Sequence, residues 1–115
     1  MLTQRQLFLQ HVAQTSDAPL GLEIEKAEGV YLYDVAGKKY IDLISGIGVS
    51  ALGHCHPNVV QAVQEQAAKY MHTMVYGEYV QSPQVQLAKY LCNVLPSTLN
   101  AVYSTNSGTE ATEGA

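Results

Sequence analysis

The chain has 115 residues and a formal net charge of −4, with 47% hydrophobic and only 14% charged residues. This acidic balance argues against nucleic acid or an anionic membrane as a partner, and the six basic residues are scattered along the chain. No apolar run approaches the roughly 20 residues that a membrane-spanning helix needs, and residues 1–10 lack a secretory signal.

The two cysteines, Cys55 and Cys92, belong to no recognisable disulfide framework. We therefore expect free thiols and a cytoplasmic location. A composition this poor in charge suits a segment buried in a larger body or a subunit interface better than a free-standing domain.

The first part of the chain is predicted to hold a short helix and three strands. Thr3 is suited to cap the helix, whose apolar face ends near Val12. The strand-like stretches are rich in Ile, Val, Leu and Tyr and cover residues 22–26, 30–35 and 39–43. Turn sequences separate them at Glu28-Gly29 and Asp34-Val-Ala-Gly37, which predicts an antiparallel meander.

A glycine-rich passage, residues 45–54, separates this meander from two predicted helices. Pro57 takes the first helical position of one helix, and Ser82-Pro83 opens the other, which Pro96 ends. Both helices carry apolar residues at helical spacing, so one face of each is expected to be buried.

The last predicted unit is a strand, a turn and a helix. Residues 101–104 form an apolar strand, and Asn106-Ser-Gly-Thr109 turns it into the helix. An α/β domain begins in this way, so the predicted fold class is α/β. We expect residues 1–50 to form the N-terminal helix and meander, and residues 51–115 to begin a further domain. The chain stops within this last helix, and we expect it to be a fragment.

The turn at Asn106-Ser-Gly-Thr109 has the parts of a phosphate site. A helix start offers unpaired backbone N–H groups, glycine lets an anion come close, and hydroxyls add donors. The turn also follows a strand, where open α/β sheets bind ligands. On these residues alone, ordinary capping by Ser107 or Thr109, with Glu110 or Glu113 completing a capping box, is the more economical interpretation.

Two competing sites are less well supported. Gly46-Ile-Gly48 resembles a loose dinucleotide pattern, but Gly53 and Pro57 interrupt the helix that should follow. The glycines are instead expected to let the backbone pass close to a ligand or a neighbouring subunit. His54-Cys-His56 has no second cluster to complete a zinc site, so we expect no metal and a structural role in which His54 ties the turn.

Four segments occur in the order and spacing of a known family. They are Gly29-Val-Tyr-Leu-Tyr-Asp34 with Gly37-Lys-Lys-Tyr-Ile-Asp42, Ser45-Gly-Ile-Gly-Val49, Leu52-Gly-His-Cys-His-Pro57, and Asn106-Ser-Gly-Thr-Glu-Ala111 followed by Glu113. Together they resemble the class III pyridoxal-phosphate-dependent aminotransferases, which include the acetylornithine, ornithine and 4-aminobutyrate enzymes. The resemblance covers nearly the whole chain.

This resemblance implies the type I pyridoxal-phosphate transferase fold in a homodimer with active sites at the subunit boundary. Residues 1–50 would belong to its small domain, and residues 51–115 would begin its cofactor-binding large domain. The residues it assigns to the cofactor phosphate are Ser107, Gly108 and Thr109. The residues it assigns to the substrate are Gly46, Ile47, Gly48, Val49 and Tyr76.

The implied activity is transfer of an amino group from an amine or amino acid to 2-oxoglutarate. The passage from Ala51 to Pro57 looks most like the acetylornithine enzymes. Ile47 stands where ornithine enzymes tend to carry an aromatic residue, whereas 4-aminobutyrate enzymes accept isoleucine there. Thr112 departs mildly from the asparagine that members commonly have.

The resemblance places the catalytic lysine far downstream, so this chain is expected to hold no catalytic residue and to be inactive alone. Arg5 is no substitute for the arginine expected to bind 2-oxoglutarate. Two interpretations of another class stay open. The chain could be a truncated, non-catalytic paralogue that associates with a partner subunit, or a small phosphate-binding module.

Overall fold

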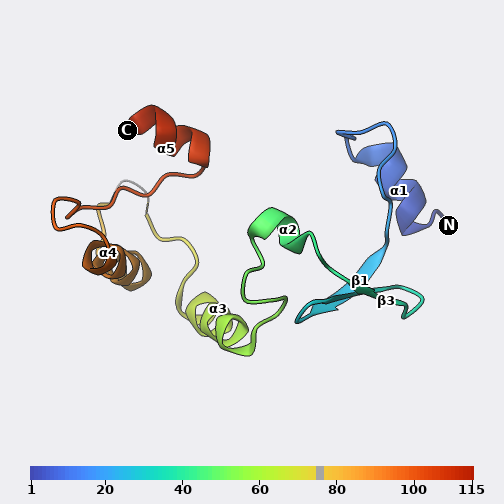
Figure 1. The fold of residues 1–115 in the computed structure, drawn as a ribbon, viewed down its shortest axis with the longest axis horizontal. Helices are drawn as coiled ribbons and strands as arrows, with labels where there is room; N and C mark the ends of the chain where they lie inside the picture. The colour runs from blue at the N-terminus through green and yellow to red at the C-terminus, as the bar shows by residue number, and fades with distance from the viewer. Residues whose placement is uncertain (75–76) are drawn as a thin grey trace. The chain divides into compact units, whose positions relative to one another are not determined.

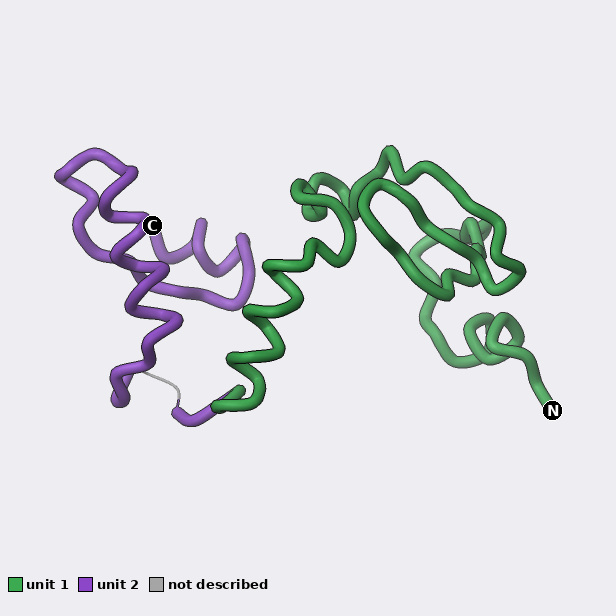
Figure 2. Tube along the Cα trace, turned by 90° about the horizontal axis from the view of Figure 1, so that it is seen from below, with its two compact units in different colours: residues 1–71 green, residues 72–115 purple. Residues whose placement is uncertain are grey.

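The computed structural model describes residues 1–74 and 77–115, which divide into two compact units, Met1–Met71 and His72–Ala115 (Figures 1 and 2). The elements of the first unit are α1 (Gln4–His11), β1 (Ile24–Glu28), β2 (Tyr31–Asp34), β3 (Lys39–Ile41), α2 (Ser45–Gly48) and α3 (Pro57–Lys69). Those of the second unit are α4 (Ser82–Val94) and α5 (Gly108–Gly114). No helix among the described residues is long and apolar enough to cross a membrane.

Helix starts follow the predicted capping chemistry. The Thr3 side chain accepts a hydrogen bond from the Gln6 backbone N–H at 3.2 Å, and the Gln6 side chain accepts one from the Thr3 backbone at 2.8 Å. This capping box stabilises a helix by about 1 kcal/mol. Pro57 and Pro83 lie in the first turns of α3 and α4, where a missing backbone N–H costs nothing.

The predicted meander is present as a three-stranded antiparallel sheet in the order β1-β2-β3. Leu32 in the central strand lies opposite Ala27 on one side and Tyr40 on the other. The strands are displaced or shorter than the predicted stretches; β1 begins at Ile24 and its register is irregular between Ile24 and Lys26.

Lysine side chains lie over tyrosine rings on this sheet. The Lys39 ammonium is 3.5 Å from the centroid of the Tyr31 ring, and the Lys26 ammonium is 4.6 Å from that of Tyr33. Cation–π attraction of this kind covers part of the aromatic surface, and the tyrosine hydroxyl suits a half-exposed position.

Asp34 fixes the turn between β2 and β3. Its Oδ1 accepts hydrogen bonds from the backbone N–H groups of Ala36 and Lys38, both at 2.9 Å, and its Oδ2 accepts one from the Tyr40 hydroxyl at 2.8 Å. The bond from Tyr40 is the main reason that the pKa of Asp34 lies below its ordinary value of 3.8. The same bond raises the pKa of Tyr40 above 10.0.

Tyr40 is therefore expected to ionise above pH 10.0, and Asp34→Asn is expected to bring its pKa back toward that value. Because the folded-state pKa is raised, the stabilisation from this bond is complete below the unfolded-state pKa and is lost as pH rises through the folded-state pKa. An NMR titration of ring-labelled Tyr40 in the complete gene product measures both values. A Tyr40 pKa that Asp34→Asn leaves unchanged would contradict the assignment.

The apolar stripes of α3 and α4, which the sequence predicts to be buried, are exposed in this chain. Val63 is 62% exposed and Leu87 is 55% exposed. Within residues 1–74 and 77–115, only the strands of the sheet pack closely on one another, and no apolar side chain is buried. The prediction of buried faces is wrong here because burial needs a covering element. Apolar exposure on this scale is typical of surfaces that contact other protein.

The strand predicted at residues 101–104 is also absent, since these residues adopt no regular structure. A strand is held by a ladder of hydrogen bonds to a neighbour. In the part of the chain that the structure describes, the three strands of the meander pair only among themselves. Tyr103 is accordingly 91% exposed.

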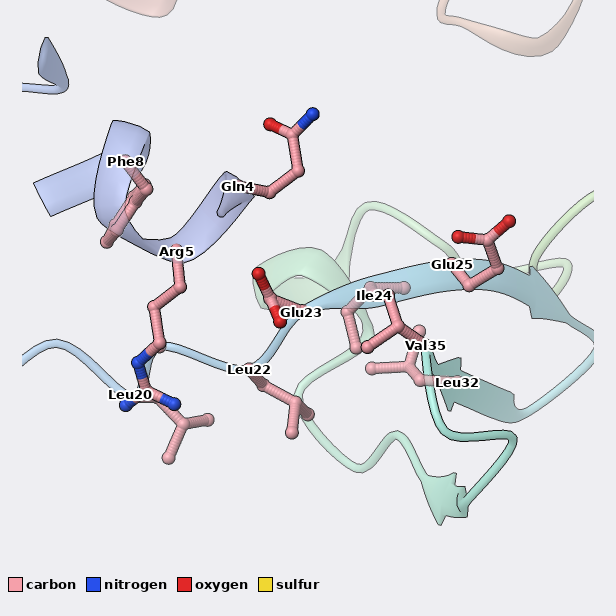
Figure 3. A pocket seen from close by; sticks show the side chains of 11 residues that line it. Gln4, Arg5, Phe8, Leu20, Leu22, Glu23, Ile24, Glu25, Leu32 and Val35 are labelled. Atoms are coloured by element: carbon pink, nitrogen blue, oxygen red, sulfur yellow. The ribbon is translucent and has the colours of Figure 1, made fainter. Parts of the chain in front are cut away.

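A pocket of about 640 Å³ lies between α1 and the sheet in the first unit (Figure 3). Phe8 and Arg5 line it from α1, and Ile24, Leu32 and Val35 line it from the opposite side. Its lining is mostly apolar, and it includes none of the described residues predicted to bind cofactor or substrate, which are 46–49 and 107–109. The pocket is the space between α1 and the sheet.

Candidate functional site

The glycine-rich passage opens with a left-handed turn. Four consecutive residues have positive φ angles: Ser45 at 50°, Gly46 at 61°, Ile47 at 62° and Gly48 at 79°. Val49 returns to the right-handed region with φ of −76°. The predicted substrate residues 46–48 therefore lie together on one tight turn, α2, and Val49 follows it directly.

This turn is strained at two positions. Glycine adopts positive φ freely, but a residue with a side chain pays about 1–2 kcal/mol there, and a β-branched residue such as Ile47 is an outlier. The Ile47 side chain is nevertheless 91% exposed, so its own packing does not hold it there. Strain that persists in this way requires surrounding contacts to impose it, and it is often found at functional sites.

Hydrogen bonds that the Asp42 carboxylate accepts provide such contacts. Its Oδ1 accepts from the backbone N–H groups of Ile44 at 3.0 Å and Ser45 at 2.9 Å. The turn is closed by a bond from the Ser50 N–H to the Ser45 carbonyl at 2.9 Å. The carboxylate thus ends β3 and starts the left-handed turn directly after it.

The other oxygen of Asp42 binds His54. His54 Nε2 lies 2.7 Å from Asp42 Oδ2, and the side chains of Asp42 and His54 are only 9% and 20% exposed. An ionised carboxylate only accepts hydrogen bonds, so Nε2 carries the donated hydrogen. The bond with His54, followed by the one from Ser45, lowers the pKa of Asp42 below its ordinary 3.8.

The backbone of His54 is fixed as well. Its N–H donates to the Gly29 carbonyl at 2.7 Å, and its carbonyl accepts from the Gly29 N–H at 3.0 Å. The expected structural role of His54 is confirmed, because it ties the end of the glycine-rich passage to the meander. Among the described residues, no group of three or more His, Cys, Asp or Glu side chains is arranged to hold a metal ion.

The second predicted site is the start of α5. Ser107 is the N-cap, and its Oγ accepts from the Glu110 N–H at 3.2 Å. The Glu110 carboxylate in turn accepts from the Asn106 N–H at 2.8 Å. The predicted cap by Ser107 is therefore confirmed, but the capping box is not formed, because Glu110 bonds the Asn106 N–H instead of the Ser107 N–H.

Two backbone N–H groups at the start of α5 are not used by the capping hydrogen bonds. Gly108 and Thr109 are the first two helical residues, so their N–H groups have no partner within α5, and none of the hydrogen bonds formed by the described residues engages them. A Cβ built on Gly108 would meet nothing within 4 Å, so the approach to its backbone is open. Two amides and the hydroxyls of Ser107 and Thr109 form a donor set that suits a phosphate.

The remaining predicted site residue, Tyr76, lies outside the described residues. Asp42 lies within one of the four family segments, but no function was predicted for it. The sequence signal that could have indicated one is an aspartate at the end of a predicted strand and directly before the glycine-rich passage. Residues 46–49 belong to the first unit and residues 107–109 to the second.

Residues 12–115 match the family described as aminotransferase class-III. The acetylornithine aminotransferase of Methanocaldococcus jannaschii is 44% identical over 96 residues, which cover 84% of this chain and 23% of that relative. The crystal structure of adenosylmethionine-8-amino-7-oxononanoate aminotransferase from the same organism is 30% identical with a TM-score of 0.85, covering 95% of this chain and 26% of that one.

A third similar protein is the ornithine aminotransferase of Toxoplasma gondii, with 28% identity and a TM-score of 0.69 over 93% of this chain and 24% of that one. Its structure shows partial occupancy of PLP, pyridoxal phosphate, at the active site. The chain spans about a quarter of the length of the relatives it matches. It belongs to the class-III aminotransferase family.

Proposed function

We propose that these residues act as the N-terminal part of a pyridoxal-phosphate-dependent aminotransferase. The observation that carries the proposal is the start of α5, where the N–H groups of Gly108 and Thr109 are available beside an open approach. In this proposal they and the hydroxyls of Ser107 and Thr109 bind the cofactor phosphate.

Pyridoxal phosphate, when bound, supplies the electron sink that lets an amino group move between an amine and a keto acid. The residues of this chain contribute binding and orientation. Each amide or hydroxyl bonded to the phosphate fixes one end of the cofactor and so determines where its reactive end lies. The positive end of the α5 dipole favours the same anion.

Glu110 places a negative charge beside the proposed phosphate site, so the hydrogen-bond donors there must outweigh its repulsion. Its carboxylate lies at the same helix start, where it accepts from the Asn106 N–H. The Ser107–Thr109 segment contains no lysine or arginine, so its own contribution to phosphate binding consists of directed hydrogen bonds. We propose that this arrangement holds one phosphate group in one orientation.

We propose an acetylornithine-like amino donor and 2-oxoglutarate as acceptor. The similarity to an acetylornithine enzyme supports the donor. Residues 46–49, with Tyr76, are proposed to lie at the substrate end of the site. The high structural similarity to an adenosylmethionine-8-amino-7-oxononanoate aminotransferase favours adenosylmethionine as the second candidate donor. A third candidate is 4-aminobutyrate or another omega-amino acid.

We propose further that the residues work within a polypeptide of the relatives' length, in a homodimer. The coverage of about a quarter of each relative supports the first part. The exposed apolar faces of α3 and α4 need covering protein, which the rest of the polypeptide or a second copy would supply. The catalytic lysine is expected in the remainder, and residues 51–115 then begin the cofactor-binding large domain.

The test is amino-group transfer by the complete gene product supplied with pyridoxal phosphate. Glutamate formation from 2-oxoglutarate is measured with N-acetylornithine, ornithine and 4-aminobutyrate as separate donors, and adenosylmethionine is tested with 8-amino-7-oxononanoate as the acceptor, by formation of the aminated product. We expect the highest kcat/KM with N-acetylornithine. If cofactor is bound but no donor yields glutamate, the proposed donor and acceptor are wrong.

A further inference from the structure

Two aspartates of the first unit use the same bonding pattern at two different turns. In each, Oδ1 accepts from two backbone N–H groups of the following turn and Oδ2 binds one side chain. Asp34 holds the ordinary β2–β3 turn with Tyr40. Asp42 holds the strained left-handed turn with His54.

We propose that Asp42 and His54 are positioning residues that keep the turn Ser45–Gly48 left-handed, so that it presents a fixed backbone to the substrate. We refer to this pair as the Asp42–His54 clamp. The role toward the substrate rests on the proposed function, in which residues 46–49 lie at the substrate end of the site.

The clamp connects three segments that are distant in sequence. Asp42 directly follows β3, His54 closes the glycine-rich passage, and the backbone of His54 is paired with Gly29 after β1. The turn is therefore anchored at both ends to the meander. Anchoring of this kind is what a run of four left-handed residues needs, since Ser45 and Ile47 would otherwise relax to the right-handed region.

Shielding strengthens the clamp. The Asp42 side chain is 9% exposed, so water competes little for its oxygens. The direction of the Asp42 pKa, lowered mainly by His54, shows that the bond favours the ionised carboxylate. An ionised Asp42 is also the better acceptor for the N–H groups of Ile44 and Ser45.

The test compares His54→Ala with His54→Gln in the complete gene product. Alanine removes the side-chain bond and keeps the backbone pairing with Gly29, whereas glutamine retains an N–H donor that reaches Asp42. Amide hydrogen exchange of Ile44 and Ser45 is the primary measurement. We expect His54→Ala to accelerate it roughly ten- to hundredfold, the range for a lost hydrogen bond to a charged group, and His54→Gln to restore much of the protection.

The matched control is Asp34→Asn, which alters the same bonding pattern at the other turn. It is expected to change exchange at Ala36 and Lys38 and to leave Ile44 and Ser45 protected. Unchanged exchange at Ile44 and Ser45 in His54→Ala would overturn the clamp. So would acceleration in His54→Ala that His54→Gln does not reduce.

Kinetic measurements then test the clamp separately from the proposed function. In an active enzyme, His54→Ala should raise KM for the amino donor about tenfold while the Kd for pyridoxal phosphate stays within about twofold. An inactive wild-type protein with the expected exchange pattern would refute the proposed function and leave the clamp standing. Faster exchange with an unchanged KM would refute the link between the turn and the substrate.

Discussion

Gly53→Ala is expected to destabilise the first unit more than any other single methyl addition discussed here. Gly53 has a φ of +80°, and a Cβ at this position would lie 3.0 Å from the Gly29 carbonyl oxygen and 3.2 Å from the Gly29 Cα. The obstacle is backbone, and this backbone also pairs with His54. A left-handed alanine alone costs about 1–2 kcal/mol, so we expect a total loss of at least about 2 kcal/mol.

Gly37→Ala is the matched control for this substitution. Gly37 has a similar φ of +78°, but a Cβ there meets nothing within 4 Å. The difference between the two variants therefore isolates the contact with Gly29. Thermal unfolding of the complete gene product measures it, since each kcal/mol shifts Tm by roughly 2–4 °C in a domain of about 150–250 residues. Equal Tm values for the two variants would show that the Gly53–Gly29 approach is not fixed.

Gly108→Ala is expected to weaken pyridoxal phosphate binding about ten- to hundredfold without destabilising the protein. Nothing lies within 4 Å of a Cβ at Gly108 and its φ is not positive, so the fold accommodates alanine, which is also the better helix former by about 1 kcal/mol. Only a ligand that approaches the Gly108 backbone would meet the added methyl group. Stability and affinity should therefore move in different directions.

Binding of pyridoxal, which lacks the phosphate, makes this prediction specific. Gly108→Ala should reduce the preference for the phosphate-bearing form and leave the Kd for pyridoxal nearly unchanged. Gly114→Ala is the matched control, because Gly114 ends the same helix and is equally unobstructed. An equal loss of affinity for both ligands in Gly108→Ala would place the phosphate elsewhere.

Local elements of this fold could be predicted from the sequence because short-range chemistry determines them. The cap at Thr3, the prolines in the first turns of α3 and α4, and the Asp34 turn each depend on residues within a few positions. The elements that could not be predicted correctly depend on distant partners. Residues 101–104 have strand composition but no pairing strand among the described residues, and the stripes of α3 and α4 have nothing to cover them.

The candidate site likewise combines features that neighbouring residues determine with features that depend on distant partners. The glycine pattern marked residues 46–49, yet composition alone could not predict that Ser45 and Ile47 would also be left-handed, because isolated residues of these types avoid that region. The pairing of Asp42 with His54 spans twelve positions and becomes visible only when the meander brings them together. For the start of α5, the sequence left capping and phosphate binding as alternatives. The structure permits both, because the Ser107 cap leaves the N–H groups of Gly108 and Thr109 available.

The start of α5 is proposed to hold the phosphate of pyridoxal phosphate, and a crystal structure of the complete gene product with this cofactor is the decisive experiment. We predict phosphate oxygens at roughly 2.7–3.2 Å from the backbone nitrogens of Gly108 and Thr109. A bound cofactor whose phosphate is held by other residues, with these two amides facing elsewhere, would show that the proposed phosphate site is wrong.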